Sequence, residues 1–156
     1  MLRIGLISDT HGLLRPEALR FLRACDHIVH AGDIGDGAVL EALNEIAPVT
    51  AVRGNNDEGE WASMLPDTQT LRVGGIALFV LHDIKELAAH RVPADVQAVV
   101  CGHSHKPQIT RSGAGLLVIN PGSAGPPRFK LPVTAGEVTV ANDGSFAPRW
   151  VDLLSP

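Results

Sequence analysis

The sequence contains no tyrosine, few other aromatic residues and only two cysteines among its 156 residues. Aromatic residues make up 4% of the chain, so the core has to be built mainly from Val, Leu, Ile and Ala. Hydrophobic residues reach 45%, which allows a substantial core, and the length suits one domain over residues 1–156. The two cysteines, Cys25 and Cys101, provide no disulfide framework, and we interpret both as structural thiols in a reducing compartment.

The sequence also lacks recognisable targeting and membrane segments. The residues after Met1 run directly into an apolar strand pattern, which predicts no signal peptide. No apolar run reaches the roughly 18 residues that a transmembrane helix needs. The formal net charge of −4 argues against a nucleic-acid binder with a broad basic face, although a bound metal can reverse the local sign. We therefore expect a cytoplasmic protein with no membrane association and no broad nucleic-acid surface.

Short apolar runs alternate with helical segments in the first half of the chain. Pro16 is placed to open the first helix, because proline is favoured at the first helical position. This βαβαβ order predicts a parallel sheet with crossover helices. The expected strands are 2–8, 27–30 and 49–52, and the expected helices are 16–25 and 37–46.

Glycine-containing turns join pairs of short apolar runs in the second half, which predicts hairpins. We expect this half to be mostly antiparallel, with one further buried strand over 96–101 and an ordered Pro- and Gly-rich loop over 122–132. A chain that begins as α/β and ends in hairpins predicts two packed sheets with helices outside. The expected hairpin strands are 70–73 with 76–81, 109–111 with 116–119 around the turn 112–115, and 133–141 with 146–153.

Polar or metal-capable residues directly follow six of these strands. In α/β sheets, ligands bind at the carboxyl ends of the strands. The set holds two carboxylates, one asparagine and four histidines, which suits two ions that share a carboxylate. Mixed nitrogen and oxygen ligands favour Mn, Fe, Zn or Co over Ca. The candidate ligands are Asp9, His11, Asp33, Asn55, His82, His103 and His105.

Each candidate taken alone has a simpler interpretation. A strand-end aspartate commonly caps a turn, and a single histidine is more often a core or surface residue than a ligand. We favour that interpretation for His27 and His90. For His30 a structural role and a role in orienting Asp33 both remain open. We nevertheless favour a metal site over separate structural roles, because all the strand-end motifs occur together in this order along one chain.

Together these motifs resemble the calcineurin-like metallophosphoesterases. The segments 54–57 and 120–123 resemble the small bacterial and archaeal phosphodiesterases of that superfamily, and the likeness covers nearly the whole chain. It implies a four-layer αββα sandwich of class α/β (α+β), in which two mixed sheets pack face to face with helices outside. The motifs are Asp9-x-His11, Gly32-Asp33, Gly54-Asn55, His82 and Gly102-His103-x-His105.

The resemblance further implies a dinuclear, metal-dependent phosphodiesterase. A metal-bound hydroxide would attack a small phosphodiester or nucleotide. Asp33 would bridge two divalent ions, with Mn as our first expectation and Fe, Zn, Ni or Co as alternatives. The first ion would be held by Asp9, His11 and His105, and the second by Asn55, His82 and His103.

Two positions depart from the pattern of many relatives. Asn56 stands where a histidine often donates a proton to the leaving group, so we expect esters with acidic leaving groups or protonation by water. We assign Asp33, Asn55 and Asn56 to catalysis, and Asn56 also to substrate binding. Asp83 stands where glycine is common, and it could narrow the site's mouth or orient a metal-bound histidine. Arg53 is expected to bind substrate; for it and Arg128, a solvated surface role is an equally good interpretation.

Three other functions fit the sequence less well. A metal-free protein-binding scaffold, such as the small retromer subunit, would be expected to have degraded ligand positions, and here all seven are intact. A phosphoprotein phosphatase would carry an arginine where this chain has Gly37. Related nucleases usually carry capping segments for which this chain has no room. Because lid material is scarce, a homo-oligomer could complete the cleft through 122–132.

Overall fold

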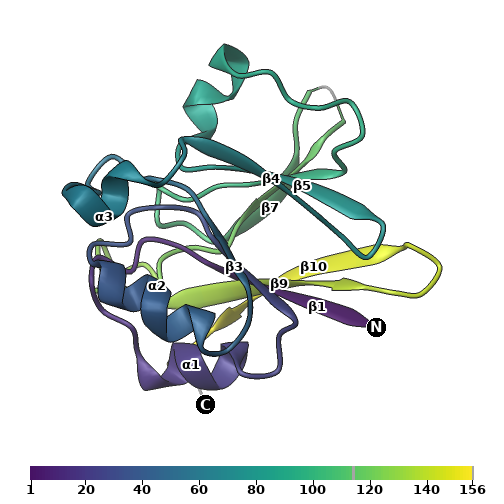
Figure 1. Ribbon diagram of the computed structural model, residues 1–156. Coiled ribbons are helices and arrows are strands. Elements are labelled where there is room, and N and C mark those ends of the chain that lie inside the picture. The colour runs from purple at the N-terminus through teal and green to yellow at the C-terminus, as the bar shows by residue number, and fades with distance from the viewer. Residues whose placement is uncertain (114, 156) are drawn as a thin grey trace.

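The computed structural model describes residues 1–113 and 115–155 and shows two five-stranded sheets packed face to face (Figure 1). The strand orders are β10-β9-β1-β2-β3 in the first sheet and β4-β5-β6-β8-β7 in the second. The strands are β1 (Leu2–Ile7), β2 (His27–His30), β3 (Val49–Ala51), β4 (Thr68–Val73), β5 (Ile76–Leu81), β6 (Ala98–Val100), β7 (Gln108–Arg111), β8 (Leu117–Asn120), β9 (Thr134–Val140) and β10 (Phe146–Asp152). The helices are α1 (Pro16–Leu22), α2 (Gly37–Asn44), α3 (Glu60–Ser63) and the 3₁₀ helix η1 (Ile84–Ala89).

The first sheet contains the expected βαβαβ unit. β1 pairs in parallel with β2, and β2 with β3, while the hairpin β9–β10 joins β1 on the other side in antiparallel pairing. Both helices end earlier than predicted, α1 at Leu22 instead of Cys25 and α2 at Asn44 instead of Ile46. At the end of each helix a backbone hydrogen bond joins residues three positions apart, from Cys25 N to Leu22 O and from Ile46 N to Leu43 O. The last residues expected to be α-helical therefore form a tighter turn.

The expectation of a mostly antiparallel second half is wrong at the centre of the second sheet. β6 pairs in parallel with both β5 and β8, and only the edge strands β4 and β7 are antiparallel to their neighbours. The expected hairpins do form, but β6 enters the sheet between them. The predicted turn 112–115 includes Ala114, which lies outside the described residues.

The main core lies between the two sheets, and β5 shows how one strand serves two layers. Ile76, Leu78 and Val80 point into the space between the sheets. The alternate residues of the strand face outward and pack with Ile84 and Leu87 of η1. A strand that is buried on both faces reads as a continuous apolar run, which explains the sequence of β5.

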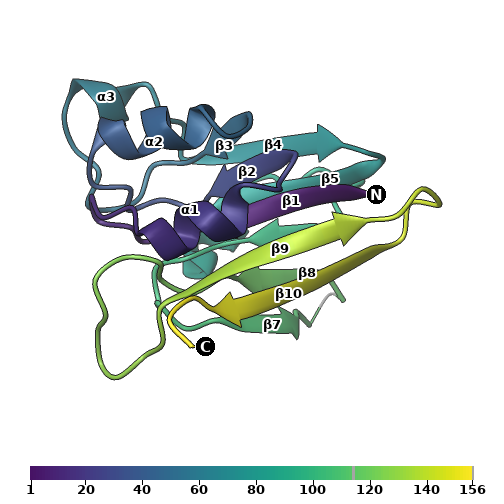
Figure 2. The same cartoon turned by 90° about the horizontal axis from the view of Figure 1, so that it is seen from below.

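The outer layers of the molecule are unequal. α1 and α2 cover the outside of the first sheet (Figure 2), and α1 lies so close that a Cβ at Gly5 would sit 2.4 Å from Leu22 Cδ2. Outside the second sheet the helical layer is reduced to η1 and its flanking loop. The expected helix–sheet–sheet–helix order is therefore present, with a thin fourth layer. In the described part of the chain, no helix is both long and apolar enough to cross a bilayer.

A charged cluster fixes the outer face of the first sheet. Glu137 of β9 is only 4% exposed and accepts hydrogen bonds from Arg149 Nε at 2.5 Å and Arg3 Nε at 2.8 Å. Both guanidinium groups also lie over the Phe21 ring, at 5.8 and 5.9 Å from its centroid. Burial acts to raise the pKa of Glu137, but the hydrogen bonds from the two arginines outweigh it and lower the pKa.

We predict that Glu137→Gln lowers the free energy of unfolding by about 1–3 kcal/mol at pH 7, because it removes charge-assisted hydrogen bonds. A carboxyl group with a lowered folded pKa stabilises the protein above its unfolded pKa and loses this effect as the pH falls through the folded pKa. Urea unfolding across a series of acidic buffers should therefore show the two proteins converging in stability. Glu41→Gln, at an exposed position of α2, is the control, and a pH-independent difference for Glu137→Gln would contradict the account.

Candidate metal centre

The polar residues after β1 and β2 lie side by side because parallel pairing continues beyond the strands. Asp9 N donates to Gly32 O at 3.0 Å, and His11 N donates to Asp33 O at 2.9 Å. Gly12 N extends the pattern to Ile34 O at 2.7 Å. These bonds carry the Asp9–His11 segment alongside Asp33 at the carboxyl edge of the first sheet.

Left-handed backbone is concentrated in these strand-end loops. This region is unfavourable for residues other than glycine, at a cost of roughly 1–3 kcal/mol each, and persists where the surrounding structure enforces it. Among the described non-glycine residues, only Phe129 and Lys130 share it outside the candidate ligands. The candidate ligands with positive φ are Asp9 (54°), His11 (47°), Asp33 (55°), His103 (70°) and His105 (64°).

Asp9, His11 and His105 form one group, with one ligand atom from each residue lying within 4.8 Å of the others. Asp9 Oδ1 is 3.5 Å from His105 Nε2. Asp9 Oδ1, His11 Nε2 and His105 Nδ1 are buried and have no hydrogen-bond partner among the residues that the structure describes. Because an unsatisfied buried polar atom costs about 1–3 kcal/mol, a cation that binds Asp9 Oδ1 and His11 Nε2 fits this group, with His105 Nε2 facing the same carboxylate oxygen.

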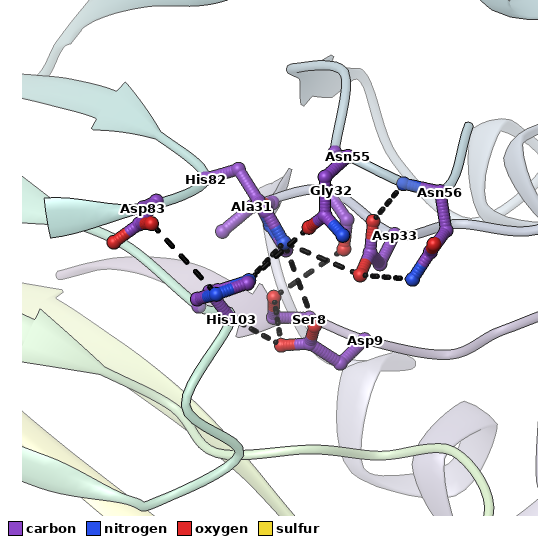
Figure 3. A network of polar contacts seen from close by, with 12 residues as sticks. Ser8, Asp9, Ala31, Gly32, Asp33, Asn55, Asn56, His82, Asp83 and His103 are labelled. Atoms are coloured by element: carbon purple, nitrogen blue, oxygen red, sulfur yellow. Dashed lines mark hydrogen bonds and ion pairs between the residues drawn. The ribbon is translucent and has the colours of Figure 1, made fainter. Parts of the chain in front are cut away.

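Asp33, His82 and His103 form the second group, also within 4.8 Å. His82 Nδ1 donates to Ala31 O at 2.8 Å, which leaves Nε2 directed at Asp33 Oδ2, 3.3 Å away (Figure 3). His103 Nδ1 lies 3.3 Å from His82 Nε2 and 3.1 Å from Asn55 Oδ1. A histidine that donates one ring N–H to a carbonyl and presents the other nitrogen is the arrangement found in metal ligands.

Asp33 lies between the two groups. Its Oδ2 is 3.3 Å from His82 Nε2 and 3.9 Å from His11 Nε2. Asn56 holds it from the other side, since its backbone N donates to Oδ1 at 2.9 Å and its Nδ2 donates to Oδ2 at 3.1 Å. Burial acts to raise the pKa of Asp33, but His82 and the hydrogen bond from the backbone N of Asn56 outweigh it and lower the pKa to about 2. The carboxyl group is therefore ionised at neutral pH.

The pKa values of the two histidines on either side of Asp33, His11 and His82, shift in opposite directions. Burial lowers the pKa of His11, although Asp33 and Asp9 oppose the shift, and the positive charge of Arg128 adds to it. Burial also acts to lower the pKa of His82, but Asp33 and Asp9 outweigh it, so that pKa is raised. The same two carboxylates thus act on both groups, as expected for one continuous site.

His30 is a structural brace. Burial of the whole ring lowers the pKa of His30 to about 3, so the imidazole is neutral. Nδ1 accepts from Gly32 N at 3.1 Å, and Nε2 lies 2.9 Å from Thr10 Oγ1, whose hydroxyl donates to Ile34 O. The bonds do not reach the Asp33 carboxylate itself. They join the two loops that carry Asp9, His11 and Asp33.

Comparison with known proteins identifies the family. Residues 2–143 match the calcineurin-like phosphoesterase superfamily domain. The chain belongs to the calcineurin-like phosphoesterase superfamily. A probable metallophosphoesterase of Methanocaldococcus jannaschii is 33% identical in an alignment of 143 residues that covers 82% of this chain and 71% of that protein. The resemblance that the motifs predicted is therefore confirmed.

Solved structures confirm the fold. An archaeal phosphodiesterase superimposes with a TM-score of 0.75 at 22% identity, covering 96% of this chain and 100% of that chain. Vps29 of Chaetomium thermophilum superimposes with a TM-score of 0.74 at 18% identity, covering 97% of each chain. At such identities these likenesses establish the shared architecture alone.

Two supporting residues of this phosphoesterase domain escaped the sequence interpretation. Asp57, only 6% exposed, accepts from Gly35 N at 2.9 Å and Gly54 N at 2.8 Å and so ties the Asp33 loop to the Asn55 loop. Asn120 donates to Gly102 O at 2.9 Å and braces the loop of His103. Both lie within segments that carried the resemblance, but a side chain bonded to backbone groups has no signature of its own in one sequence.

Two of the expected substrate-binding residues are engaged with the protein. Asn56 bonds to Asp33, as described, and its amide has no acidic proton to give a leaving group. Arg53 pairs with Asp67 at 2.7 Å, while both residues line a hollow beside Asn55, His82 and His103. A substrate contact for either residue stays a prediction.

Asp83 is placed to act on His103. Its Oδ1 accepts from Lys85 N at 3.0 Å and caps η1, and its Oδ2 lies 3.7 Å from His103 Nε2. Since His103 Nδ1 faces Asn55 and His82, the carboxylate is on the opposite side of the ring from the candidate ion. Of the two roles left open by the sequence, the geometry favours orienting the histidine.

We predict that Asp83→Asn and Asp83→Gly weaken binding of Mn²⁺ at the second group by about 10- to 100-fold, as loss of such partners does in other sites. Asn can still accept from Lys85 N, so only the glycine variant should also lose stability. Calorimetric Mn²⁺ titration and thermal unfolding separate these effects. Asp36→Asn, at the exposed cap of α2, is the matched control; unchanged Mn²⁺ affinity in both Asp83 variants would contradict this role.

Proposed function

We propose that this phosphoesterase hydrolyses small phosphodiesters, with two divalent ions held on either side of Asp33. The observation that carries the proposal is the pair of ligand groups that meet at this carboxylate, together with the unpartnered buried atoms Asp9 Oδ1 and His11 Nε2. Mn²⁺ is the first candidate ion, and Fe, Zn, Ni and Co fit the same mixed donors. One ion would be held by Asp9, His11 and His105, the other by Asn55, His82 and His103, and Asp33 would contact both.

When bound, such ions neutralise phosphoryl oxygens and lower the pKa of a coordinated water. The contribution of the chain is geometric. Asn56 fixes both oxygens of Asp33, Ala31 O fixes the ring of His82, and Ser8 Oγ donates to Asp9 Oδ2 at 2.8 Å. Held in this way, the ligand residues need little rearrangement, which is the main requirement for positioning phosphoryl groups.

The leaving group sets the ester class. In hydrolysis, a water oxygen bonds to phosphorus, the bond to the leaving oxygen breaks, and that oxygen must carry negative charge or gain a proton. The neutral amide of Asn56 supplies no proton and is already bonded to Asp33. We therefore propose a preference for diesters with acidic leaving groups, which can depart as anions, or for protonation by solvent.

The alternative is a metal-free protein-binding scaffold of the same fold, and the structural likeness to Vps29 keeps it in view. A scaffold gains nothing from buried ligand atoms without partners or from left-handed backbone at five ligand residues. These features favour the enzyme. Metal-dependent hydrolysis separates the two, because a Vps29 of Entamoeba histolytica has been solved with Zn²⁺ and bound metal alone therefore does not distinguish an enzyme from a scaffold.

The direct test is hydrolysis of bis(4-nitrophenyl) phosphate with Mn²⁺. We expect chelator to abolish the activity and added Mn²⁺ to restore it. Asp33→Asn should lower kcat/KM about 100-fold or more, since it removes the charge between the two ions. Asp36→Asn is the control on the same loop. An Asp33→Asn enzyme with the wild-type rate, or an inactive wild type that binds no Mn²⁺, would contradict the proposal.

A further inference from the structure

A groove runs from the candidate metal centre onto the outer face of the second sheet. It has a volume of about 530 Å³, within the usual range for ligand pockets, and it begins at His103 and Asp83. Strand register defines its wall, since Gln108 pairs with Asn120 and Thr110 pairs with Val118. Val118 packs on the outer face of the sheet, so its register partner Thr110 also lies on that side.

The floor of the groove is apolar and uncharged. Cys101 contributes a thiol that is only 2% exposed. Val118 and Ile84 complete this surface. Hydroxyl and amide side chains at Ser104, Gln108, Thr110 and Ser112 surround it. An apolar floor with a polar rim suits a planar ring that carries hydrogen-bonding edges.

Two cations also line the groove. The chain has only three lysines, and two of them, Lys85 and Lys106, are here. Neither forms an ion pair within residues 1–113 and 115–155. With Asp83 as the one carboxylate of the lining, the groove has a formal charge of +1.

The neighbouring hollow at the second ligand group has the opposite charge. It contains Arg53, already paired with Asp67, and four carboxylates in all, which gives a formal charge of −3. The bound ions would offset the carboxylates of this hollow and are already occupied by the scissile phosphate, whereas the groove has a positive charge from its side chains alone, so a second negative group of the substrate is attracted to the groove. The carboxylates of the hollow are Asp57, Asp67, Asp83 and Glu86.

We propose that the groove is a substrate subsite for a nucleoside arm that carries a second phosphate. The ring lies on the floor of Cys101 and Val118, and the second phosphate contacts Lys85 and Lys106. This inference rests on the proposed phosphodiesterase activity and narrows its substrates to nucleotide diesters that have a further terminal phosphate. Lys85 and Lys106 are then specificity residues and take no part in bond cleavage.

The test compares two chromogenic diesters, 4-nitrophenyl thymidine 5′-phosphate with and without a 3′-phosphate. Wild type should show a KM about 10-fold lower for the 3′-phosphorylated ester. Lys85→Gln/Lys106→Gln should remove this preference by raising that KM, with kcat and the other ester unchanged. Thr110→Trp, which fills the groove without changing charge, should raise KM for both nucleoside esters but leave bis(4-nitrophenyl) phosphate hydrolysis unaffected. Arg20→Gln/Arg23→Gln, which removes two positive charges at exposed positions in the last turn and at the C-cap of α1, is the charge-matched control.

A second readout is independent of turnover. Thymidine 3′,5′-bisphosphate should bind the wild-type protein in calorimetry and bind the double lysine variant about 10-fold more weakly. No preference in the wild type, or an unchanged preference and affinity in the folded double variant, would overturn the subsite. If no diester is hydrolysed but the bisphosphate binds in a lysine-dependent way, the proposed activity fails while the subsite stands.

Discussion

The left-handed turns at the strand ends are the constraint on which the site depends. Five ligand residues adopt this backbone at the edge where the strands of both sheets end. These turns carry the carboxylates and imidazoles of the two ligand groups. The turns after β1 and β2 are held by backbone bonds from Asp9 and His11, and the Asn55 loop is tied to them by Asp57. The close-packed sheets therefore fix the ligand positions before any ion arrives.

The close packing of the ligand residues buries charged and polar groups in a small volume, which costs free energy. Asp33 stays ionised because Asn56 and His82 donate to or face its oxygens, and His11 tends to be neutral because it is buried. Buried atoms on Asp9, His11 and His105 have no partner in the described structure. A divalent ion would relieve the costs at Asp9 Oδ1 and His11 Nε2 together, so folding and metal binding would be coupled at these residues. The left-handed backbone and the unpartnered side-chain atoms thus occur at the same ligand residues, and both are explained by a site built to hold metal.

Much of the fold could be predicted because its signals are local. The βαβαβ order, the helix start at Pro16 and the hairpins follow from periodicity and turn residues. The parallel centre of the second sheet could not, because β6 pairs with β8 across the intervening β7, and no local pattern records that pairing. α3 and η1 are too short for a clear periodic signal. At the site, the candidate ligands are visible as strand-end motifs, whereas the bracing by Asp57 and the pairing of Arg53 with Asp67 depend on distant or backbone partners.

The central claim is that two ions lie on either side of Asp33. Anomalous diffraction from a crystal soaked with Mn²⁺ tests it most directly, because it locates the metal without requiring a substrate. The account predicts two anomalous peaks, one at Asp9, His11 and His105 and one at Asn55, His82 and His103, with the Asp33 carboxylate between them. An empty site in Mn²⁺-soaked crystals, or one peak that Asp33 does not contact, would contradict it.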